Sequence, residues 1–313
     1  MNKSQKNAFT LIELLFVIVV IGIVGGFALE AVRQFYEGIY RTGEYDKRVA
    51  EADHILEQVS KYFENAISDS IVNLDQEIGG VVTQDCYDSP AGDLNDYTIA
   101  FIAVDIDSLQ GVSGEPSWSK YGNSIGFNLF SPDSNYTEVN NIMVSLNPLL
   151  PLIGSAIYRK DGEVEGNGMC ERYGWANSGN TNNVYAKIIN LVSDTTLSLN
   201  STLSYYGGSA VSNAYVLRTA YAFNTDENGT FRLYSNFRPW NGERHNTNGT
   251  ENILAENVAH FQIKYDNTNT ARNSDVGNVI TLKICMRGLD SNLSSTDTDA
   301  NNICRERKVH VRY

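Results

Sequence analysis

This sequence has few prolines, no two cysteines close together in the chain, and no excess of positive charge. Only 6 of its 313 residues are Pro, against 25 Gly, and Asn, Ser and Thr are abundant, which is typical of strands joined by turns. Its 24 Lys and Arg are outnumbered by 37 Asp and Glu, giving a formal net charge of −13. Such an acidic chain is poorly suited to general binding of nucleic acid, so we expect no nucleic-acid partner.

The four cysteines are widely spaced, and no two of them form a C-x-x-C pair: they are Cys86, Cys170, Cys285 and Cys304. A zinc or redox motif is therefore unsupported. An even number of scattered cysteines beyond an apolar segment is typical of two disulfides formed in an oxidising compartment, with four buried thiols as the alternative. Of the three possible connectivities, we predict Cys285–Cys304 together with Cys86–Cys170.

Signatures of enzyme chemistry are also scarce. The segment Gly122–Gly126 fits G-x-S-x-G, but a nucleophile elbow at Ser124 needs a strand before it and a helix after it, and Phe127–Pro132 reads as a short strand and turn. No H-E-x-x-H motif, phosphate-binding loop or dinucleotide fingerprint is present. We therefore expect no enzyme activity, no catalytic residue and no cofactor. The oxygen-rich segment Asp161–Asn167 offers Ca²⁺ ligands as an alternative, without EF-hand spacing.

One long apolar run stands out, from Phe9 to Leu29, with Glu13 as its only charge. At about 1.5 Å per residue this run spans roughly 30 Å as a helix, which is enough to cross a bilayer. Lys3 and Lys6 precede it and favour a cytoplasmic N-terminus, with the rest of the chain outside. A carboxylate within a membrane span is costly unless it has a partner, so Glu13 predicts an ion pair made on assembly.

The segment Ala8-Phe9-Thr10-Leu11-Ile12-Glu13, followed by this apolar run, resembles the class III signal of type IV pilins and of the pseudopilins of type II secretion. The resemblance implies that a prepilin peptidase cuts between Ala8 and Phe9 and that Phe9 is then N-methylated. It also implies that Glu13 pairs with the N-terminal amine of a neighbouring subunit.

Two features depart from the usual family pattern. Ala8 replaces the customary Gly at the cleavage site, and the proline that many pilins carry later in this helix is absent. Gly22 and Gly26 form a G-x-x-x-G pattern instead, which permits close approach of a second helix.

Beyond the membrane-length run, apolar residues recur at spacings of three and four from Val49 to Ala66, separated by charged residues. This spacing predicts that the helix continues as an amphipathic segment packed on a globular head and ends near Ser68–Ser70. A helix from Phe9 to Ser68 would be roughly 90 Å long.

From about Ile71 the apolar period changes to two, which is typical of strands. We predict a hairpin with its turn at Asn224–Gly229, and loops at Ser131–Asn141, Asp161–Asn183 and Asn241–Thr250. The strand candidates are Tyr97–Val104, Val184–Val192, Ala214–Phe223, Phe231–Ser235, Val258–Tyr265, Val279–Met286 and Lys308–Tyr313.

The predicted fold class is α+β, a long N-terminal helix packed on a β-rich head, as in pilins. We divide the chain into a leader (1–8), a transmembrane helix (9–29), an amphipathic helix (30–70) and a β-rich head (71–313). The expected location is the inner membrane, crossed once, with the head in the periplasm and the assembled filament in the periplasm or at the cell surface.

The segment Ile253–Tyr265, followed by the strand at Val279–Met286, is similar to the C-terminal part of J-type minor pseudopilins and W-type minor pilins. The resemblances together imply a structural minor subunit in the tip or initiation complex of a filament. They imply other subunits of that filament and the prepilin peptidase and methyltransferase as partners. The alternatives are a major pilin that forms the fibre shaft and a membrane-anchored periplasmic binding module or enzyme.

Overall fold

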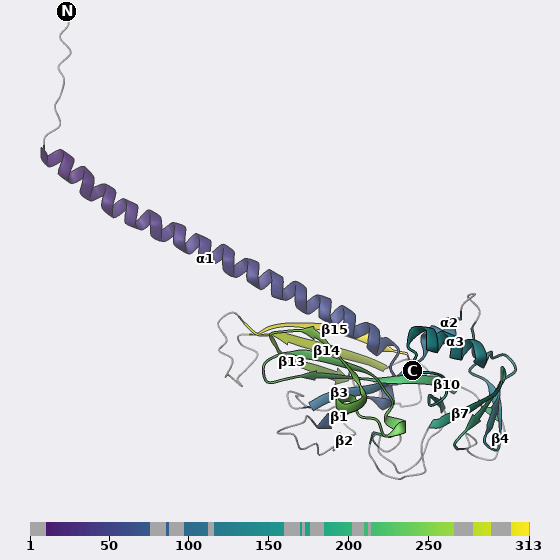
Figure 1. The fold of residues 1–313 in the computed structure, drawn as a ribbon. Coiled ribbons are helices and arrows are strands. Elements are labelled where there is room, and N and C mark those ends of the chain that lie inside the picture. Colours follow the sequence, from purple (N-terminus) through teal and green to yellow (C-terminus); the bar gives the residue numbers. More distant parts are fainter. Residues whose placement is uncertain are drawn as a thin grey trace, which may run out of the picture. The chain divides into compact units, whose positions relative to one another are not determined.

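The computed structural model describes residues 11–75, 86–87, 97–111, 116–159, 170, 173–175, 185–201, 210–211, 214–265, 278–288 and 302–312. The chain separates into two compact units, Met1–Ala50 and Glu51–Tyr313, and we call the second unit the head. Helix α1 (Leu11–Glu64) begins in the first unit and ends in the head (Figure 1). A short 3₁₀ turn, η1 (Ser68–Ser70), follows it. The helix therefore ends at Glu64, a few residues before the predicted end near Ser68–Ser70.

The part of α1 in the first unit is long and apolar enough to cross a membrane. Its large apolar side chains are exposed, including Leu11, Phe16 and Phe27. In the head the same helix has a buried stripe, because Ala52, Leu56, Val59 and Phe63 recur at spacings of three and four.

The head contains a large sheet whose described strand pairs are antiparallel. The described strands run in the order β2-β1-β3-β10-β6-β7-β8-β5-β4-β9, with β11 pairing with both β10 and β12. A second sheet has the order β13-β14-β15. The bounds are β1 (Val72–Asp75), β2 (Cys86–Tyr87), β3 (Tyr97–Val104), β4 (Gly122–Ile125), β5 (Asn128–Phe130), β6 (Ala156–Arg159), β7 (Tyr185–Ser193), β8 (Thr196–Leu199), β9 (Ala210–Val211), β10 (Ala214–Thr225), β11 (Phe231–Phe237), β12 (Thr250–Ala255), β13 (Val258–Tyr265), β14 (Asn278–Met286) and β15 (Ile303–Val311).

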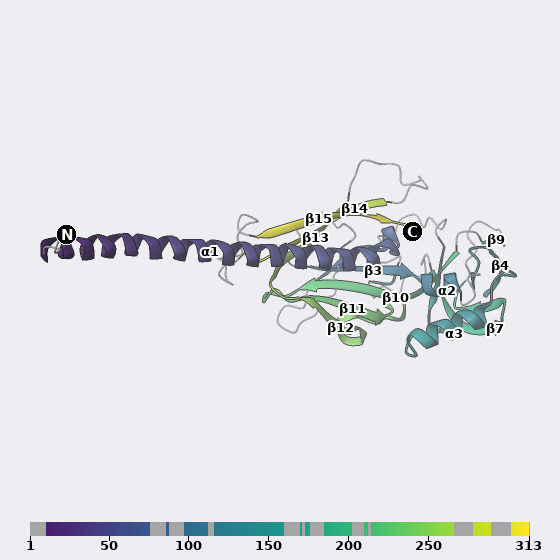
Figure 2. The same cartoon turned by 90° about the horizontal axis from the view of Figure 1, so that it is seen from above.

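Both faces of the large sheet are buried at β3. Phe101 and Ala103 point into a core shared with the last turns of α1 and the small sheet, whereas Ala100 and Ile102 point into a core on the opposite face. In Figure 2 the last turns of α1 lie between β13–β15 and the strands β3, β10, β11 and β12. The predicted α+β class, a long N-terminal helix followed by a β-rich domain, is confirmed.

The other helices that the structure describes with their bounds in the head are short: α2 (Ile106–Gln110), α3 (Tyr136–Leu146), η2 (Pro239–Asn241) and α5 (His245–Asn248). They correct two predicted loops. Ser131–Asn141 contains the start of α3, which Asn135 caps by accepting a hydrogen bond from Glu138 N. Asn241–Thr250 contains α5 and the first residue of β12. Most of the third predicted loop, Asp161–Asn183, lies outside the described residues.

The predicted strands are present, although the ends of most of them differ from the predicted bounds. Strands β3 and β13 have the predicted bounds, and β10 and β11 form the predicted antiparallel hairpin, in which Phe223 lies opposite Leu233. The last strand was placed too late, because β15 already begins at Ile303, where it pairs with β14.

The end of the described chain returns to the end of α1. The backbone N–H of Arg312 donates to the backbone oxygen of Glu64 at 3.3 Å. The Arg312 guanidinium lies 3.4 Å from the Glu64 carboxylate. The C-terminal strand is therefore attached to the helix terminus by both backbone and side chain.

Candidate functional site

The membrane-length part of α1 carries three of the predicted site residues. Glu13 lies in its first turn, and Gly22 and Gly26 follow. A Cβ built on either glycine would meet no atom within 4 Å in the described structure. Neither glycine is therefore required by packing within the described chain, and both leave helix surface that a second helix can approach closely. Ala8 and Phe9 lie outside the described residues.

One predicted disulfide is present in the small sheet. Cys285 of β14 and Cys304 of β15 lie directly opposite one another, with Cα atoms 4.0 Å apart and a bond between their sulfurs. Cys170 is buried and also disulfide-bonded. The side chain of Cys86 lies outside the described residues, so the Cys86–Cys170 bridge stays a prediction.

His260 of β13 lies beside this disulfide, with its ring nitrogen and the two sulfurs all within 4.8 Å of one another. One histidine and two cysteines form a common zinc-binding set, but cysteine binds zinc as a free thiolate. Because both sulfurs are joined to each other, the group is a cross-link beside a histidine and not a metal centre. The alternative Ca²⁺ segment, Asp161–Asn167, lies outside the described residues.

Ser124 does not lie on a nucleophile elbow. Its segment forms β4, which turns at Gly126 and returns as β5, so a strand follows the serine where a hydrolase needs a helix. The Ser124 hydroxyl is buried and has no hydrogen-bond partner in the described structure.

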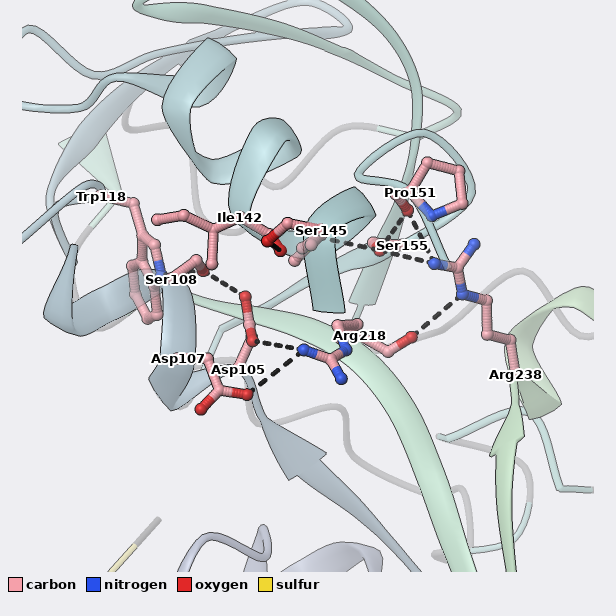
Figure 3. Close-up of polar contacts among 11 residues, drawn as sticks. Asp105, Asp107, Ser108, Trp118, Ile142, Ser145, Pro151, Ser155, Arg218 and Arg238 are labelled. Atoms are coloured by element: carbon pink, nitrogen blue, oxygen red, sulfur yellow. Dashed lines mark hydrogen bonds and ion pairs between the residues drawn. The ribbon is translucent and has the colours of Figure 1, made fainter. Parts of the chain in front are cut away.

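A buried charge cluster follows β3, and our sequence analysis missed it (Figure 3). The side chain of Asp105 is 1% exposed, and its Oδ1 lies 3.7 Å from Nη1 of Arg218. The same guanidinium nitrogen lies 3.3 Å from Oδ2 of Asp107, whose side chain is 63% exposed. The Ser108 hydroxyl donates to Asp105 and accepts a 3.1 Å hydrogen bond from the Trp118 indole.

Burial raises the pKa of Asp105, while the hydrogen bond from Ser108 and the charge of Arg218 partly oppose that rise. The hydrogen bond from Ser108 and the charge of Arg218, and not water, thus favour the ionised form of this buried carboxyl group. A sequence signal existed, since Asp105 directly follows a largely apolar strand that ends at Val104, and Asp107 lies two residues further on. Nothing in the sequence indicated that Arg218, in a distant strand, would face them.

A second buried guanidinium, Arg238, ties this region to the loop before β6. Its Nε donates to the backbone oxygen of Arg218 at 3.0 Å, and its Nη2 donates to the oxygen of Pro151 at 2.7 Å and to Ser155 Oγ at 3.1 Å. Gly154 is needed beside it, because a Cβ there would lie 2.8 Å from Arg238 Nη1 and its φ is +87°. Burial lowers the pKa of Arg238 to about 10, so it stays charged at neutral pH.

A cavity of about 750 Å³ opens beside Arg218, within the head. Its walls come from the last turns of α1, the residues that follow β3, and strands β10, β11 and β12. Side chains from all of these elements line it, among them Tyr62, Asn65, Arg218, Tyr221 and Asn252.

Two β-bulges lie at this cavity. In β10 the pairing with β3 shifts between Leu217 and Thr219, so Arg218 is an extra residue without a partner position in β3. In β11 two residues, Ser235 and Asn236, lie opposite the single residue Tyr221, and Asn236 has a φ of +64°. Bulges of this kind redirect side chains, and strained backbone is concentrated at functional sites.

Comparison with known proteins supports the N-terminal resemblance. Residues 3–29 match the model of the prokaryotic N-terminal methylation motif. Together with the long apolar helix, this match is consistent with the type IV pilin and pseudopilin family and with membrane anchoring of a globular head. It implies processing by a prepilin peptidase and assembly with other pilins. No curated protein and no solved structure matches the chain.

Proposed function

We propose that this chain is a structural subunit of a type IV pilus or type II secretion filament, in a minor position at or near the tip. The observation that carries the proposal is the methylation motif at residues 3–29, which runs directly into the continuous helix Leu11–Glu64. The head is the periplasmic or extracellular part, and the first unit is the inner-membrane anchor.

The proposed anchor has the chemistry that assembly requires. Cleavage after Ala8 would free the amine of Phe9, and Glu13 of a neighbouring subunit is the carboxylate that can pair with it in the membrane. The open glycine surface at Gly22 and Gly26 supports close packing of α1 against helices of other subunits.

Two features support the minor, tip-proximal position. The head, Glu51–Tyr313, is large for a subunit repeated along a shaft, because shaft helices pack at about 8–10 Å between axes and their heads share a crowded outer layer. The resemblance of Ile253–Tyr265 to minor subunits points the same way; in the head this segment runs from β12 into β13.

Quantitative mass spectrometry of sheared filaments tests the position. We expect this chain at a small fraction of the most abundant subunit, and deletion of its gene should reduce filament initiation while the pool of major subunit remains. If it is itself the most abundant subunit, it is the major pilin.

Intact-mass analysis of the membrane-extracted protein tests the filament role. The stable form should begin at Phe9 and carry one added methyl group. A stable form that keeps residues 1–8 would favour the rival of another class, a membrane-anchored periplasmic binding module or enzyme.

A further inference from the structure

We propose that the cavity beside Arg218 binds a neutral saccharide, one or two sugar rings in size. The cavity volume of about 750 Å³ lies within the roughly 300–1,000 Å³ of small-molecule sites. This inference rests on the head alone and does not depend on the proposed role in a filament.

An aromatic surface is available for the C–H face of a sugar ring. Tyr62 of α1 and Tyr221 of β10 meet with ring centroids 5.0 Å apart at an interplanar angle of 58°. Both residues line the cavity, and each ring combines an apolar body with a hydroxyl group. Burial raises the pKa of Tyr221 to about 12, so its hydroxyl remains a hydrogen-bond donor.

Planar polar side chains line the same cavity. The amides of Asn65 and Asn252 line the cavity, and neither side chain has a hydrogen-bond partner among the described residues. Each amide offers donors and an acceptor a short distance apart, which matches the paired hydroxyls of a sugar. Asn236 and Arg218 reach the same space from the two bulges.

The charges of the lining balance. Two cations, Lys61 and Arg218, and two carboxylates, Asp105 and Asp107, line the cavity, and Arg218 already pairs with both carboxylates. An anionic ligand would approach these carboxylates, and a cationic ligand would approach Arg218 and Lys61. A neutral ligand avoids both penalties and can still accept hydrogen bonds from the fixed guanidinium.

The test uses the full chain in lauryldimethylamine oxide micelles, because detergents with sugar headgroups would compete. Glucose, galactose, N-acetylglucosamine, lactose, cellobiose and diacetylchitobiose are titrated while saturation-transfer NMR and tyrosine fluorescence are recorded. Glucuronic acid and glucosamine serve as charged counterparts. We expect at least one neutral sugar to bind with a Kd of about 1 mM, more tightly than its charged counterpart. The same sugar coupled to beads distinguishes a free ligand from the terminal unit of a longer glycan.

The double variant Asn65→Ala/Asn252→Ala should weaken this binding by about tenfold or more. The matched control, Asn123→Ala/Asn190→Ala, removes two exposed amides elsewhere on the head and should leave binding unchanged. Because Asn252 is exposed, the single variant Asn252→Ala tests the site even if the double variant does not fold. The proposal is overturned if no neutral sugar saturates, if the cavity variants bind as the wild type does, or if a charged counterpart binds more tightly.

Discussion

Arg218 lies against Asp105 with its Nη1 3.7 Å from the carboxylate Oδ1, although Asp105 follows β3 and Arg218 lies in β10, far away in the sequence. The arginine side chain is 15% exposed and the aspartate side chain 1% exposed. Little water can replace either partner, so the head tolerates the aspartate charge only while the arginine is present.

Arg218→Met should therefore destabilise the head by about 3 kcal/mol at pH 7, because the buried carboxyl group of Asp105 loses its charged partner. The loss should shrink towards pH 4.5. The raised pKa of Asp105 means that the folded variant takes up its proton before the unfolded chain does, so acid stabilises the variant relative to neutral pH. Urea unfolding followed by fluorescence measures both values, since all 3 Trp lie in the head.

Arg312→Met is the matched control for that experiment. Its ion pair with Glu64 is exposed, with side chains 62% and 43% accessible, so the expected loss is below about 1 kcal/mol. An equal loss at both pH values for Arg218→Met would contradict the burial argument.

The Cys285–Cys304 disulfide should contribute about 3 kcal/mol, because it closes a loop with a sequence separation of 19 residues. Replacing both cysteines by alanine should lower the urea midpoint by the corresponding amount. Adding a reducing agent to this variant should then lower its urea midpoint little further through this site. A variant as stable as the wild type under oxidising conditions would show that the two strands are held by pairing alone.

His245 should make the head less stable in mild acid. Its ring packs on Tyr234 and Phe237, at centroid distances of 5.1 and 6.3 Å, and burial lowers its pKa from 6.5 to about 4. Between these values the unfolded chain binds the proton and the folded head does not. Stability should therefore fall as the pH drops from 6.5 to 4, by up to about 3 kcal/mol.

Comparison of unfolding free energies at pH 7 and pH 4.5 checks this expectation. His245→Gln should reduce the loss of stability between pH 7 and pH 4.5. His310→Gln, at an exposed position of β15, should leave that loss unchanged. If the two variants show the same pH dependence, His245 is not the group responsible.

Glu13→Leu should strongly reduce assembly without impairing membrane insertion. Leucine makes the helix more apolar, so insertion stays equal or improves, while the attraction to a neighbour's N-terminal amine is lost. Site-specific crosslinking between subunits should fall about tenfold, the equivalent of about 1.4 kcal/mol. Glu13→Asp keeps the charge and should retain part of the signal. Normal crosslinking of the leucine variant would exclude the pairing role.

Strong periodicity explains which parts of the fold the sequence predicted. In β14, Ile280, Leu282, Ile284 and Met286 occupy alternate positions and are all buried, so the sequence pattern predicted both the strand and its buried face. Short elements have too few residues to show such a pattern. Helix α3 was predicted as a loop because its first turn is rich in polar residues, although Tyr136, Val139 and Met143 recur at helical spacing and are buried.

The candidate site residues likewise fall into those that the sequence could indicate and those that it could not. Residues of the N-terminal signal lie close together in the chain, so Glu13, Gly22 and Gly26 could be proposed as site residues from the sequence alone, and their roles stay predictions. The cavity depends on contacts between distant segments, and the pair Asp105–Arg218 exists only because β10 lies beside β3. A bulge that turns Arg218 out of the regular alternation has no signature in a single sequence.

The attachment of Arg312 to Glu64 has a mechanical consequence. A pulling force along α1 reaches the last residue of the helix, Glu64, where two contacts with Arg312 transmit it to the end of the final strand. That strand is covalently joined to its neighbour through Cys304 and Cys285. Tension on the helix is thus distributed into a cross-linked pair of strands, and the last turn of the helix resists being pulled away from the head.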